Sequence, residues 1–286
     1  MSEKWISEII KPDLKYSYKA EEVLFSGKSE FQKVEVFKTK SFGNVLFNDD
    51  LAMLSEFDEF IYHDMIAHPA LFLHPNPKNV LVIGGGDGGT LREVLRHRGV
   101  DKCVMVEIDK MVVDASREFI PLTSSELDSP RAELIIDDGI KYVKETDQKF
   151  DVVLVDSTDP IGPATPLFGK EFYQDVFRVL TDDGISVSQG ENSFFELEMQ
   201  KSILKNLSSV FPKTYMYNYS NVLYPGGLWS FAMATKGLNP IKDFDSSLVE
   251  NSELEFKYYN SGIHQACFQL ASFQKKALGE YLSPIK

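Results

Sequence analysis

The first fifty residues alternate between apolar and polar positions, as half-buried strands do. The segment FQKVEVFKT alternates over 31–39, and SFGNVLFNDDLAML over 41–54 carries three consecutive polar residues at its centre. The pattern predicts strands from about 16 to 53, with a hairpin turn at 48–50. We therefore expect a small N-terminal β domain.

The next segment, residues 55–75, has a different period. Ile61, Met65 and Phe72 lie at helical spacing, and Ser55 precedes a group of acidic residues. This arrangement predicts an amphipathic helix with Ser55 as its N-cap.

From Val80 onward, short apolar runs alternate with helical segments. The strands are nearly continuous in apolar residues, which is typical of a parallel sheet covered on both faces. The runs are VLVI, CVMVEID, AELIIDDG, DVVLVDSTD and GISVSQGE. We expect a Rossmann-like doubly wound α/β domain over 61–286, preceded by the β-strand domain over 1–60. The segment from Leu223 predicts a further hairpin with antiparallel character.

Composition narrows the class of partner. The formal net charge is −13, which argues against a nucleic-acid partner, because phosphates require stripes of Lys and Arg. We expect no secretory leader and no membrane association, because no apolar run approaches the roughly 18 residues of a membrane span. The two cysteines, Cys103 and Cys267, allow no disulfide framework beyond one bridge, so we predict a cytoplasmic protein. Cys103 lies in an apolar run and is expected in the core.

Acidic residues follow the predicted parallel strands at the edge where such sheets bind ligands. The first strand is followed by the glycine loop GGGDGG with Asp87 inside it, and later strands end at Glu107, Asp138 and Asp156. An acid about twenty residues after a glycine loop accepts hydrogen bonds from ribose hydroxyls. Asp138 is placed to meet an adenine amino group, so the order of acids predicts a nucleoside site.

Each acid also has a purely structural interpretation, as an N-cap or a solvated loop residue. We favour that interpretation for Asp109 and Asp137, and the functional one for Glu107 and Asp156.

Asp87 indicates which nucleoside is bound. A pyrophosphate over the loop would face its carboxylate, which is electrostatically unfavourable. A nucleoside without phosphates and with a positive sulfonium, such as a relative of S-adenosylmethionine, fits better, with Asp87 holding an ammonium tail. The segment DSTD at 156–159 adds a second anionic pocket, which suits a diamine.

Several motifs together resemble the spermidine synthases, or polyamine aminopropyltransferases, from about Trp5 to past His264. They are GGGDGGTLREV, VEID, DDG, DSTDPIGPATPLF, FYQ, YPGGLWSF, KYYNSGIHQACF, FGNVLFND and DEFIYHDM. The resemblance implies a sheet of the S-adenosylmethionine-dependent methyltransferase type with seven strands. It implies transfer of an aminopropyl group from decarboxylated S-adenosylmethionine to an amine, usually putrescine, giving spermidine and 5′-methylthioadenosine. It also implies no metal or dissociable cofactor, and a homodimer or homotetramer.

The resemblance further implies roles for individual residues. Asp156 would be the catalytic carboxylate, assisted by Tyr62. The donor would be bound by Gln32, His63, Asp87, Glu107, Asp138, Gly139, Pro163 and Leu167. The acceptor would be bound by Asp156, Ser157, Asp159, Gln189 and Tyr224.

The sequence departs from the family pattern at two places. Val222 and Leu223 replace the common Pro-Thr before YPGG, and Thr165-Pro166 replaces a common Glu-Ser. These positions flank the expected acceptor pocket and closing loop, so cadaverine, agmatine or another amine is an alternative acceptor. A methyltransferase using intact S-adenosylmethionine and a non-enzymatic polyamine-binding protein are the alternative functions.

The histidines do not indicate a metal site, because His63 and His68 are five residues apart and do not share a helix face. We interpret His97 as a solvated helix end and His264 as structural support near the cleft.

Overall fold

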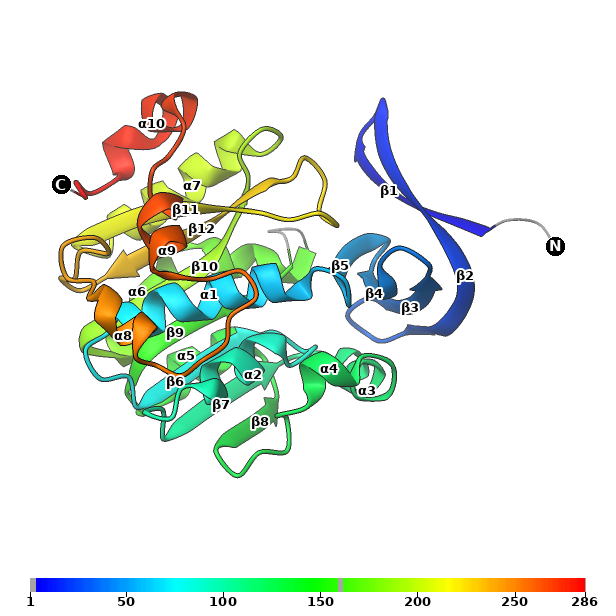
Figure 1. Ribbon diagram of the computed structural model, residues 1–286, viewed down its shortest axis with the longest axis horizontal. Helices are drawn as coiled ribbons and strands as arrows, with labels where there is room; N and C mark the ends of the chain where they lie inside the picture. The colour runs from blue at the N-terminus through cyan, green and yellow to red at the C-terminus, as the bar shows by residue number, and fades with distance from the viewer. Residues whose placement is uncertain (1–3, 159–161, 286) are drawn as a thin grey trace.

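The structure is a computed structural model that describes residues 4–158 and 162–285, with only the backbone course for residues 162 and 163. Its N-terminal part is a five-stranded antiparallel sheet in which each strand pairs with the next (Figure 1). The strands are β1 (Lys4–Lys11), β2 (Leu14–Lys28), β3 (Lys33–Thr39), β4 (Gly43–Asn48) and β5 (Leu51–Ser55). The predicted hairpin is confirmed: Asp49 and Asp50 form the turn between β4 and β5, with φ of 47° and 67°. The sequence pattern missed β1.

The second sheet has seven strands in the order β11-β12-β10-β9-β6-β7-β8. The five strands from β6 to β10 run parallel, and β12 runs antiparallel to both of its neighbours. This confirms the doubly wound sheet and the antiparallel hairpin near the C-terminus. The strands are β6 (Asn79–Gly84), β7 (Lys102–Glu107), β8 (Ala132–Ile136), β9 (Phe150–Asp156), β10 (Leu180–Asn192), β11 (Lys213–Ser220) and β12 (Leu228–Thr235).

Helices cover both faces of this sheet, and a separate apolar core lies under each set. One core includes α1 and α2, whereas the other includes α6 and α7. The helices are α1 (Glu59–Leu73), α2 (Gly89–Arg96), α3 (Lys110–Phe119), α4 (Pro121–Ser124), α5 (Gly139–Glu145), α6 (Lys170–Val179), α7 (Leu197–Ser208), α8 (Ser246–Glu250), α9 (Ser261–Cys267) and α10 (Ser272–Leu278), with 3₁₀ helices at Gly162–Phe168 and Gly279–Tyr281. Within the described residues, no helix is long and apolar enough to cross a membrane.

The predicted N-cap of α1 is wrong. The helix begins at Glu59 after Asp58, because Ser55 is still paired with Val45 in the β4–β5 ladder. The Ser55 hydroxyl instead donates to Asp58 Oδ1 at 2.5 Å. The other carboxylate oxygen of Asp58 accepts hydrogen bonds from the backbone of Val222 and Leu223 at 2.9 and 2.8 Å. Asp58 therefore ties the start of α1 to the β11–β12 loop.

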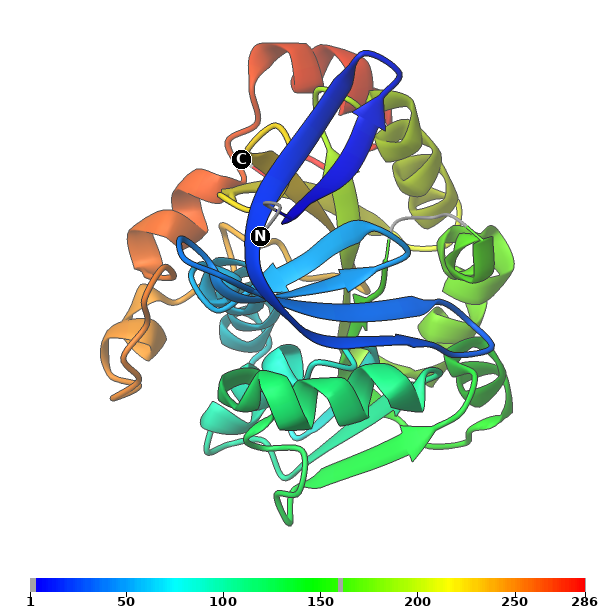
Figure 2. The same ribbon diagram turned by 90° about the vertical axis from the view of Figure 1, so that its right-hand side faces the viewer.

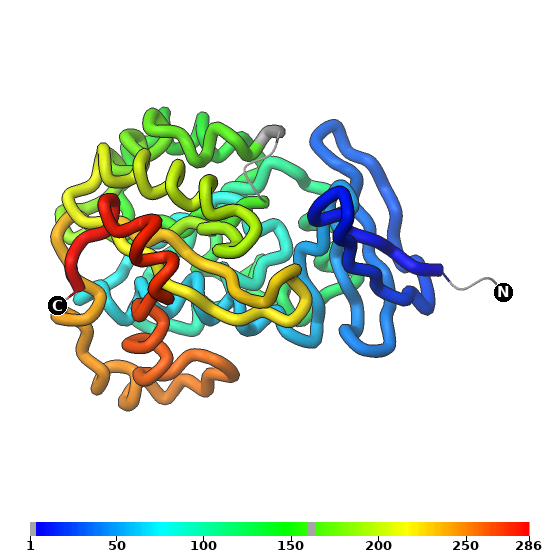
Figure 3. Tube along the Cα trace, turned by 90° about the horizontal axis from the view of Figure 1, so that it is seen from above, coloured from blue at the N-terminus to red at the C-terminus, as the bar shows by residue number. Residues whose placement is uncertain are grey.

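The N-terminal sheet lies across one end of the larger sheet and is nearest the viewer in Figure 2, and Figure 3 shows it at the opposite end of the molecule from the C-terminus. One of its faces packs on α3, where Val34, Val36 and Leu46 meet Val112 and Ala115. The β11–β12 loop joins it from the other side, with a Tyr18 hydroxyl donating to the Leu223 carbonyl at 2.7 Å. The two sheets therefore enclose the carboxyl ends of the parallel strands.

Candidate active site

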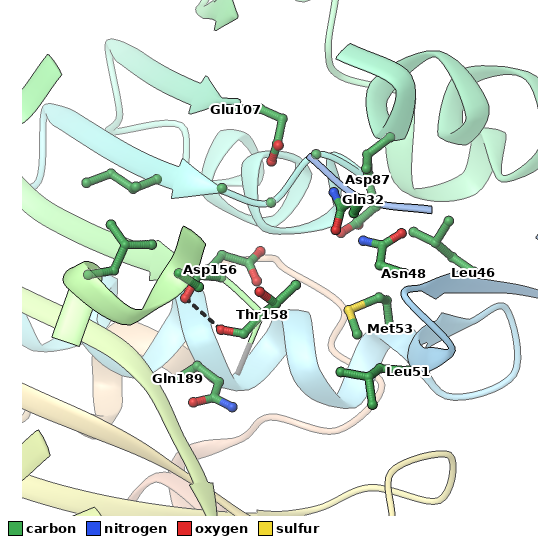
Figure 4. A pocket seen from close by; sticks show the side chains of 18 of the residues that line it. Gln32, Leu46, Asn48, Leu51, Met53, Asp87, Glu107, Asp156, Thr158 and Gln189 are labelled. Atoms are coloured by element: carbon green, nitrogen blue, oxygen red, sulfur yellow. Dashed lines mark hydrogen bonds between the residues drawn. The ribbon is translucent and has the colours of Figure 1, made fainter. Parts of the chain in front are cut away.

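A cavity lies where the N-terminal sheet meets the carboxyl ends of β6, β7, β8 and β9 (Figure 4). It gathers every predicted site residue whose side chain the structure describes. These residues are Gln32, Tyr62, His63, Asp87, Glu107, Asp138, Gly139, Asp156, Ser157, Leu167, Gln189 and Tyr224. Asp159 and the side chain of Pro163 lie outside the described part of the chain. Residues from both sheets, far apart along the chain, thus share one cavity.

The turn after β6 needs glycine because of its contact with β9. Gly84 has a left-handed φ of 81°, and a Cβ there would lie 2.1 Å from the Asp156 carbonyl oxygen. The next residue, Gly85, donates its backbone N–H to that same oxygen at 2.8 Å. The start of the glycine loop therefore serves to bring Asp156 close to β6, because only glycine fits this approach.

The Asp156 carboxylate is held from two helices. Its Oδ1 accepts a hydrogen bond from the Tyr62 hydroxyl of α1 at 2.7 Å, and its Oδ2 accepts one from Thr90 Oγ1 of α2 at 2.6 Å. Burial raises the pKa of Asp156 and the nearby Asp87 raises it further, whereas His63, Thr90 and Tyr62 oppose the rise. Burial and the Asp156 charge also raise the pKa of Tyr62 well above its usual value. Tyr62 therefore keeps its proton, and Asp156 is the proton acceptor of the pair.

His63 is a buried cation between two carboxylates. Its Nδ1 lies 2.5 Å from Glu59 Oε2, and its Nε2 lies 3.2 Å from Asp87 Oδ1. Burial lowers the pKa of His63, but Asp87 and Glu59 outweigh burial and raise it to about 10. The Arg92 guanidinium lies 2.8 Å from Glu59 Oε2 and supplies a second positive charge beside that carboxylate. The ring fits because a Cβ on Gly89 would lie 2.2 Å from it, so this glycine makes room for His63.

Glu107 and Asp109 form the next part of the wall. Glu107 is 7% exposed, and its Oε1 accepts the backbone N–H of Asp109 at 2.8 Å. Burial raises the pKa of Glu107 to about 7; the backbone N–H of Asp109 opposes the rise, whereas the charges of Asp109 and Asp156 add to it. Asp109 caps α3 through the backbone of Met111, as its structural interpretation predicted. Its Oδ2 also accepts a hydrogen bond from Gln32 Nε2 at 3.1 Å, which fixes Gln32 at the edge of the cavity.

Asp138 has both a structural and a site position. Its Oδ1 caps α5 by accepting the Ile140 backbone N–H at 2.8 Å, and the residue lines the cavity beside Gly139. Asp137 accepts from the Asp138 backbone and from Lys141, which confirms its structural interpretation.

Some residues of the cavity wall were not predicted. Glu8 of β1 is 7% exposed and accepts the Ala52 backbone N–H at 3.3 Å. Asn48 and Met53 come from β4 and β5, whereas Trp229 comes from β12. No motif marks these side chains, because they reach the cavity only through the packing of one sheet against the other.

The departures from the family pattern lie outside the cavity. Val222 is 58% exposed, and Leu223 is 1% exposed within the apolar core of the N-terminal sheet. Thr165 and Pro166 are exposed on the 3₁₀ helix Gly162–Phe168. None of the four lines the cavity. Val222 and Leu223 directly precede Tyr224 of the cavity wall, but their own side chains do not line the cavity, because Asp58 and Tyr18 hold this loop against the other sheet.

The remaining histidines also lie outside the cavity. His97 is not a solvated helix end: its Nε2 lies 2.9 Å from His68 Nδ1, and its ring packs on Phe72. His264 is buried and bonded to the Pro240 carbonyl and the Tyr259 hydroxyl. His264 is therefore structural, as predicted, but it does not line the cavity.

Two groups of side chains within the described residues have ligand atoms close enough for a metal ion: His63 with Asp87 and Asp156, and Asp64 with His68 and Glu93. In the first group, the raised pKa of His63 keeps its ring protonated, so the cation is already present. In the second group, Arg96 lies 2.5 Å from Glu93, and two backbone N–H groups donate to Asp64. His63 therefore supplies a cation beside Asp87 in the first group, and Arg96 supplies one beside Glu93 in the second.

Comparison with known proteins identifies the family. Residues 59–245 match the family model described as spermine/spermidine synthase domain, and residues 4–56 match the spermidine synthase tetramerisation domain. The chain belongs to the spermine/spermidine synthase family. It is 44% identical to the polyamine aminopropyltransferase of Alkaliphilus metalliredigens, over 96% of this chain and 98% of that relative. It is 45% identical to the enzyme of the same name from Thermotoga maritima, over 91% and 88% of the two chains.

Solved structures of spermidine synthases have the same fold. A spermidine synthase in complex with the transition-state analogue AdoDATO aligns with a TM-score of 0.95 at 43% identity, covering 97% of this chain and 95% of that one. The spermidine synthase from Thermotoga maritima aligns with a TM-score of 0.93 at 42% identity, covering 97% and 94%. The family predicted from the sequence motifs and the fold predicted from the strand pattern are both confirmed. As a member of this family, the chain is classed among the polyamine aminopropyltransferases.

Proposed function

We propose that this protein transfers the aminopropyl group of decarboxylated S-adenosylmethionine to putrescine, giving spermidine and 5′-methylthioadenosine. The observation that carries the proposal is the buried Asp156 carboxylate, held by Tyr62 and Thr90 in the middle of an acidic cavity. One side of this cavity offers groups for a nucleoside, and the other offers groups for an amine.

The donor would occupy the side formed by the parallel strands. Glu107 would accept the ribose hydroxyls, and Asp138 with Gly139 would receive the adenine. Asp87 would bind the ammonium of the aminopropyl group, and Leu167 would cover the base. A phosphate-free nucleoside fits this side because Asp87 would repel a pyrophosphate.

The acceptor would lie between Asp156 and the N-terminal sheet. Ser157, Gln189 and Tyr224 line this part of the cavity, and the resemblance adds Asp159. Glu8 supplies a further buried carboxylate from β1. A diamine carries two positive charges, so one amine would face Asp156 while the other faces Glu8.

The chemical step is a displacement at carbon. The lone pair of a neutral amine forms a new N–C bond to the methylene beside the sulfonium, and the C–S bond electrons return to sulfur as a neutral thioether. An alkyl ammonium of pKa near ~10.4 is only about 0.04% neutral at pH 7, a deficit of roughly 4.6 kcal/mol. Asp156 would orient the amine and relay its proton, and exclusion of water would contribute to activation.

We propose a homo-oligomer built through the N-terminal sheet, a dimer or a tetramer, because residues 4–56 match a tetramerisation domain. We propose that no metal or dissociable cofactor takes part, so activity should survive chelation by EDTA. The two free, buried cysteines are consistent with the predicted cytoplasmic location.

An acceptor screen tests the proposal. Purified protein would receive decarboxylated S-adenosylmethionine with putrescine, cadaverine, agmatine, 1,3-diaminopropane or spermidine, and methylthioadenosine release would be measured. We expect putrescine to give the highest rate. A higher rate with another amine would retain the chemistry and refute putrescine as the acceptor.

A comparison of donor binding distinguishes aminopropyl transfer from the methyltransferase alternative. Calorimetry should show tighter binding of the decarboxylated donor than of intact S-adenosylmethionine, whose carboxylate would face Asp87. The opposite order, together with no methylthioadenosine release with any amine, would overturn aminopropyl transfer.

A further inference from the structure

One side chain in the cavity wall has a hydrogen-bonding group that no described residue satisfies. The carbonyl oxygen Oδ1 of Asn48 is buried without a hydrogen-bond partner, and the residue as a whole is 6% exposed. Asn48 lines the cavity of the candidate active site. Buried amide carbonyls nearly always have a partner, so an unsatisfied one in a cavity wall points to a bound ligand.

The backbone holds Asn48 in place. Asn48 is the last residue of β4, pairs with Leu51 of β5, and is followed by the tight turn at Asp49 and Asp50. Side chains two apart on a strand share a face, and Leu46 on that face belongs to the apolar core over α3. The amide therefore stands at the end of β4, beyond the apolar Leu46, where a rigid hairpin holds it.

The surroundings of Asn48 indicate a cationic ligand. Figure 4 draws Asn48 on the same side of the view as Gln32 and Asp87, and all three line the one cavity. Asp87 Oδ1 already accepts the Gly89 backbone N–H at 2.8 Å and lies 3.2 Å from His63 Nε2. A ligand ammonium has three N–H donors, so an acceptor in addition to the Asp87 carboxylate would complete its hydrogen bonding.

We propose that Asn48 is a specificity-determining residue for the donor, whose aminopropyl ammonium donates a hydrogen bond to Asn48 Oδ1 while it pairs with Asp87. The inference rests on the proposed function, because it takes decarboxylated S-adenosylmethionine as the ligand. A neutral amide oxygen adds an acceptor without adding a second negative charge beside Asp87. Intact S-adenosylmethionine would place its carboxylate near two acceptor groups and bind less well.

The test is Asn48→Leu, which keeps the branched shape of the side chain and removes the amide. Asn44→Leu is the matched control, because Asn44 is the same residue type on the same strand and lies outside the cavity. Calorimetry would measure decarboxylated S-adenosylmethionine and methylthioadenosine, which lacks the ammonium. We expect Asn48→Leu to weaken binding of the decarboxylated donor by about tenfold and binding of methylthioadenosine by less than about twofold. The control should change both by less than about twofold.

Thermal unfolding separates the effect of the substitution on binding from its effect on folding. Since Asn48→Leu removes a buried unsatisfied oxygen, its Tm should equal or exceed that of the wild type. Asn48→Ala is the second variant if the leucine side chain does not fit, and it should show the same selective loss of donor affinity.

Two results would overturn the proposal for Asn48. They are equal losses of affinity for both ligands, and unchanged donor affinity. If the wild type neither binds the decarboxylated donor nor releases methylthioadenosine, the proposed function fails and this inference fails with it. A wild type that binds and turns over the donor, with a variant that does the same, refutes the role of Asn48 alone.

Discussion

The Tyr62 hydroxyl donates a hydrogen bond to Asp156 Oδ1 across 2.7 Å, which joins the first helix after the N-terminal sheet to the end of the fourth parallel strand. Thr90 binds the other oxygen. The carboxylate therefore has a fixed orientation before any ligand arrives, and fixed orientation is what a displacement at a single carbon requires.

Asp156→Asn should cut turnover by about tenfold to a hundredfold or more, because an amide cannot accept the proton of the acceptor amine. Methylthioadenosine affinity should change by less than about twofold, since the nucleoside groups remain. Steady-state rates and calorimetry would measure the two effects. Asp128→Asn is the control, because Asp128 is an exposed partner of Arg117 outside the cavity. Near-normal turnover of Asp156→Asn would contradict the catalytic role.

The His63 cation should make stability depend on pH. Burial lowers its pKa, but Asp87 and Glu59 raise it to about 10, above the ordinary 6.5. A raised pKa contributes stability that is complete below about pH 6.5 and is lost as the pH rises toward about 10. The unfolding free energy of the wild type should therefore fall relative to that of His63→Gln between pH 7 and 10, by on the order of a few kcal/mol. Urea unfolding at several pH values measures this difference.

Parallel pH slopes for the wild type and His63→Gln would show that His63 is neutral. Arg92 also faces Glu59, so Arg92→Gln provides a second comparison. It leaves His63 with both carboxylates, and the pH-dependent loss should persist in that variant.

Glu107 should make nucleoside binding stronger as the pH rises. Burial raises its pKa to about 7, so the carboxylate is largely protonated at pH 6 and largely ionised at pH 8. Ribose hydroxyls donate to the ionised form, so methylthioadenosine should bind about threefold to tenfold more tightly at pH 8 than at pH 6. Glu107→Gln should bind weakly with a flat profile by calorimetry. A flat wild-type profile would disprove the ribose contact.

Leu223→Thr tests whether the departure from the family pattern affects the acceptor. Leu223 is packed in the core of the N-terminal sheet and lies outside the cavity. The change should therefore destabilise the fold by about 1–3 kcal/mol and leave the order of preferred amines unchanged. The exposed Val222→Thr is the matched control and should alter stability by less than about 0.5 kcal/mol. A reordered acceptor panel would show that this loop acts on the pocket through Tyr224.

The sequence predicted the parallel strands and their terminal acids well, because buried strands are continuous apolar runs and their carboxyl ends converge. Glu107 and Asp156 are examples. It missed β1, where exposed and buried positions mix, and with it Glu8. It also placed the start of α1 at Ser55, since a local capping pattern cannot reveal that Ser55 is still part of a ladder. The side chains contributed by the N-terminal sheet depend on how two sheets pack, which no local pattern records.

The hydrogen bonds between the N-terminal sheet and the β11–β12 loop have a consequence for the order of folding. Tyr18 reaches the Leu223 carbonyl across 205 residues of chain, and Asp58 reaches the Val222 and Leu223 backbone across 164 and 165. Such long-range contacts form late, because the cost of closing the intervening loop precedes any gain. During synthesis the N-terminal strands leave the ribosome well before their partner loop exists. The cavity should therefore acquire its final shape only when the last hairpin has been made, and truncated chains should not bind the donor.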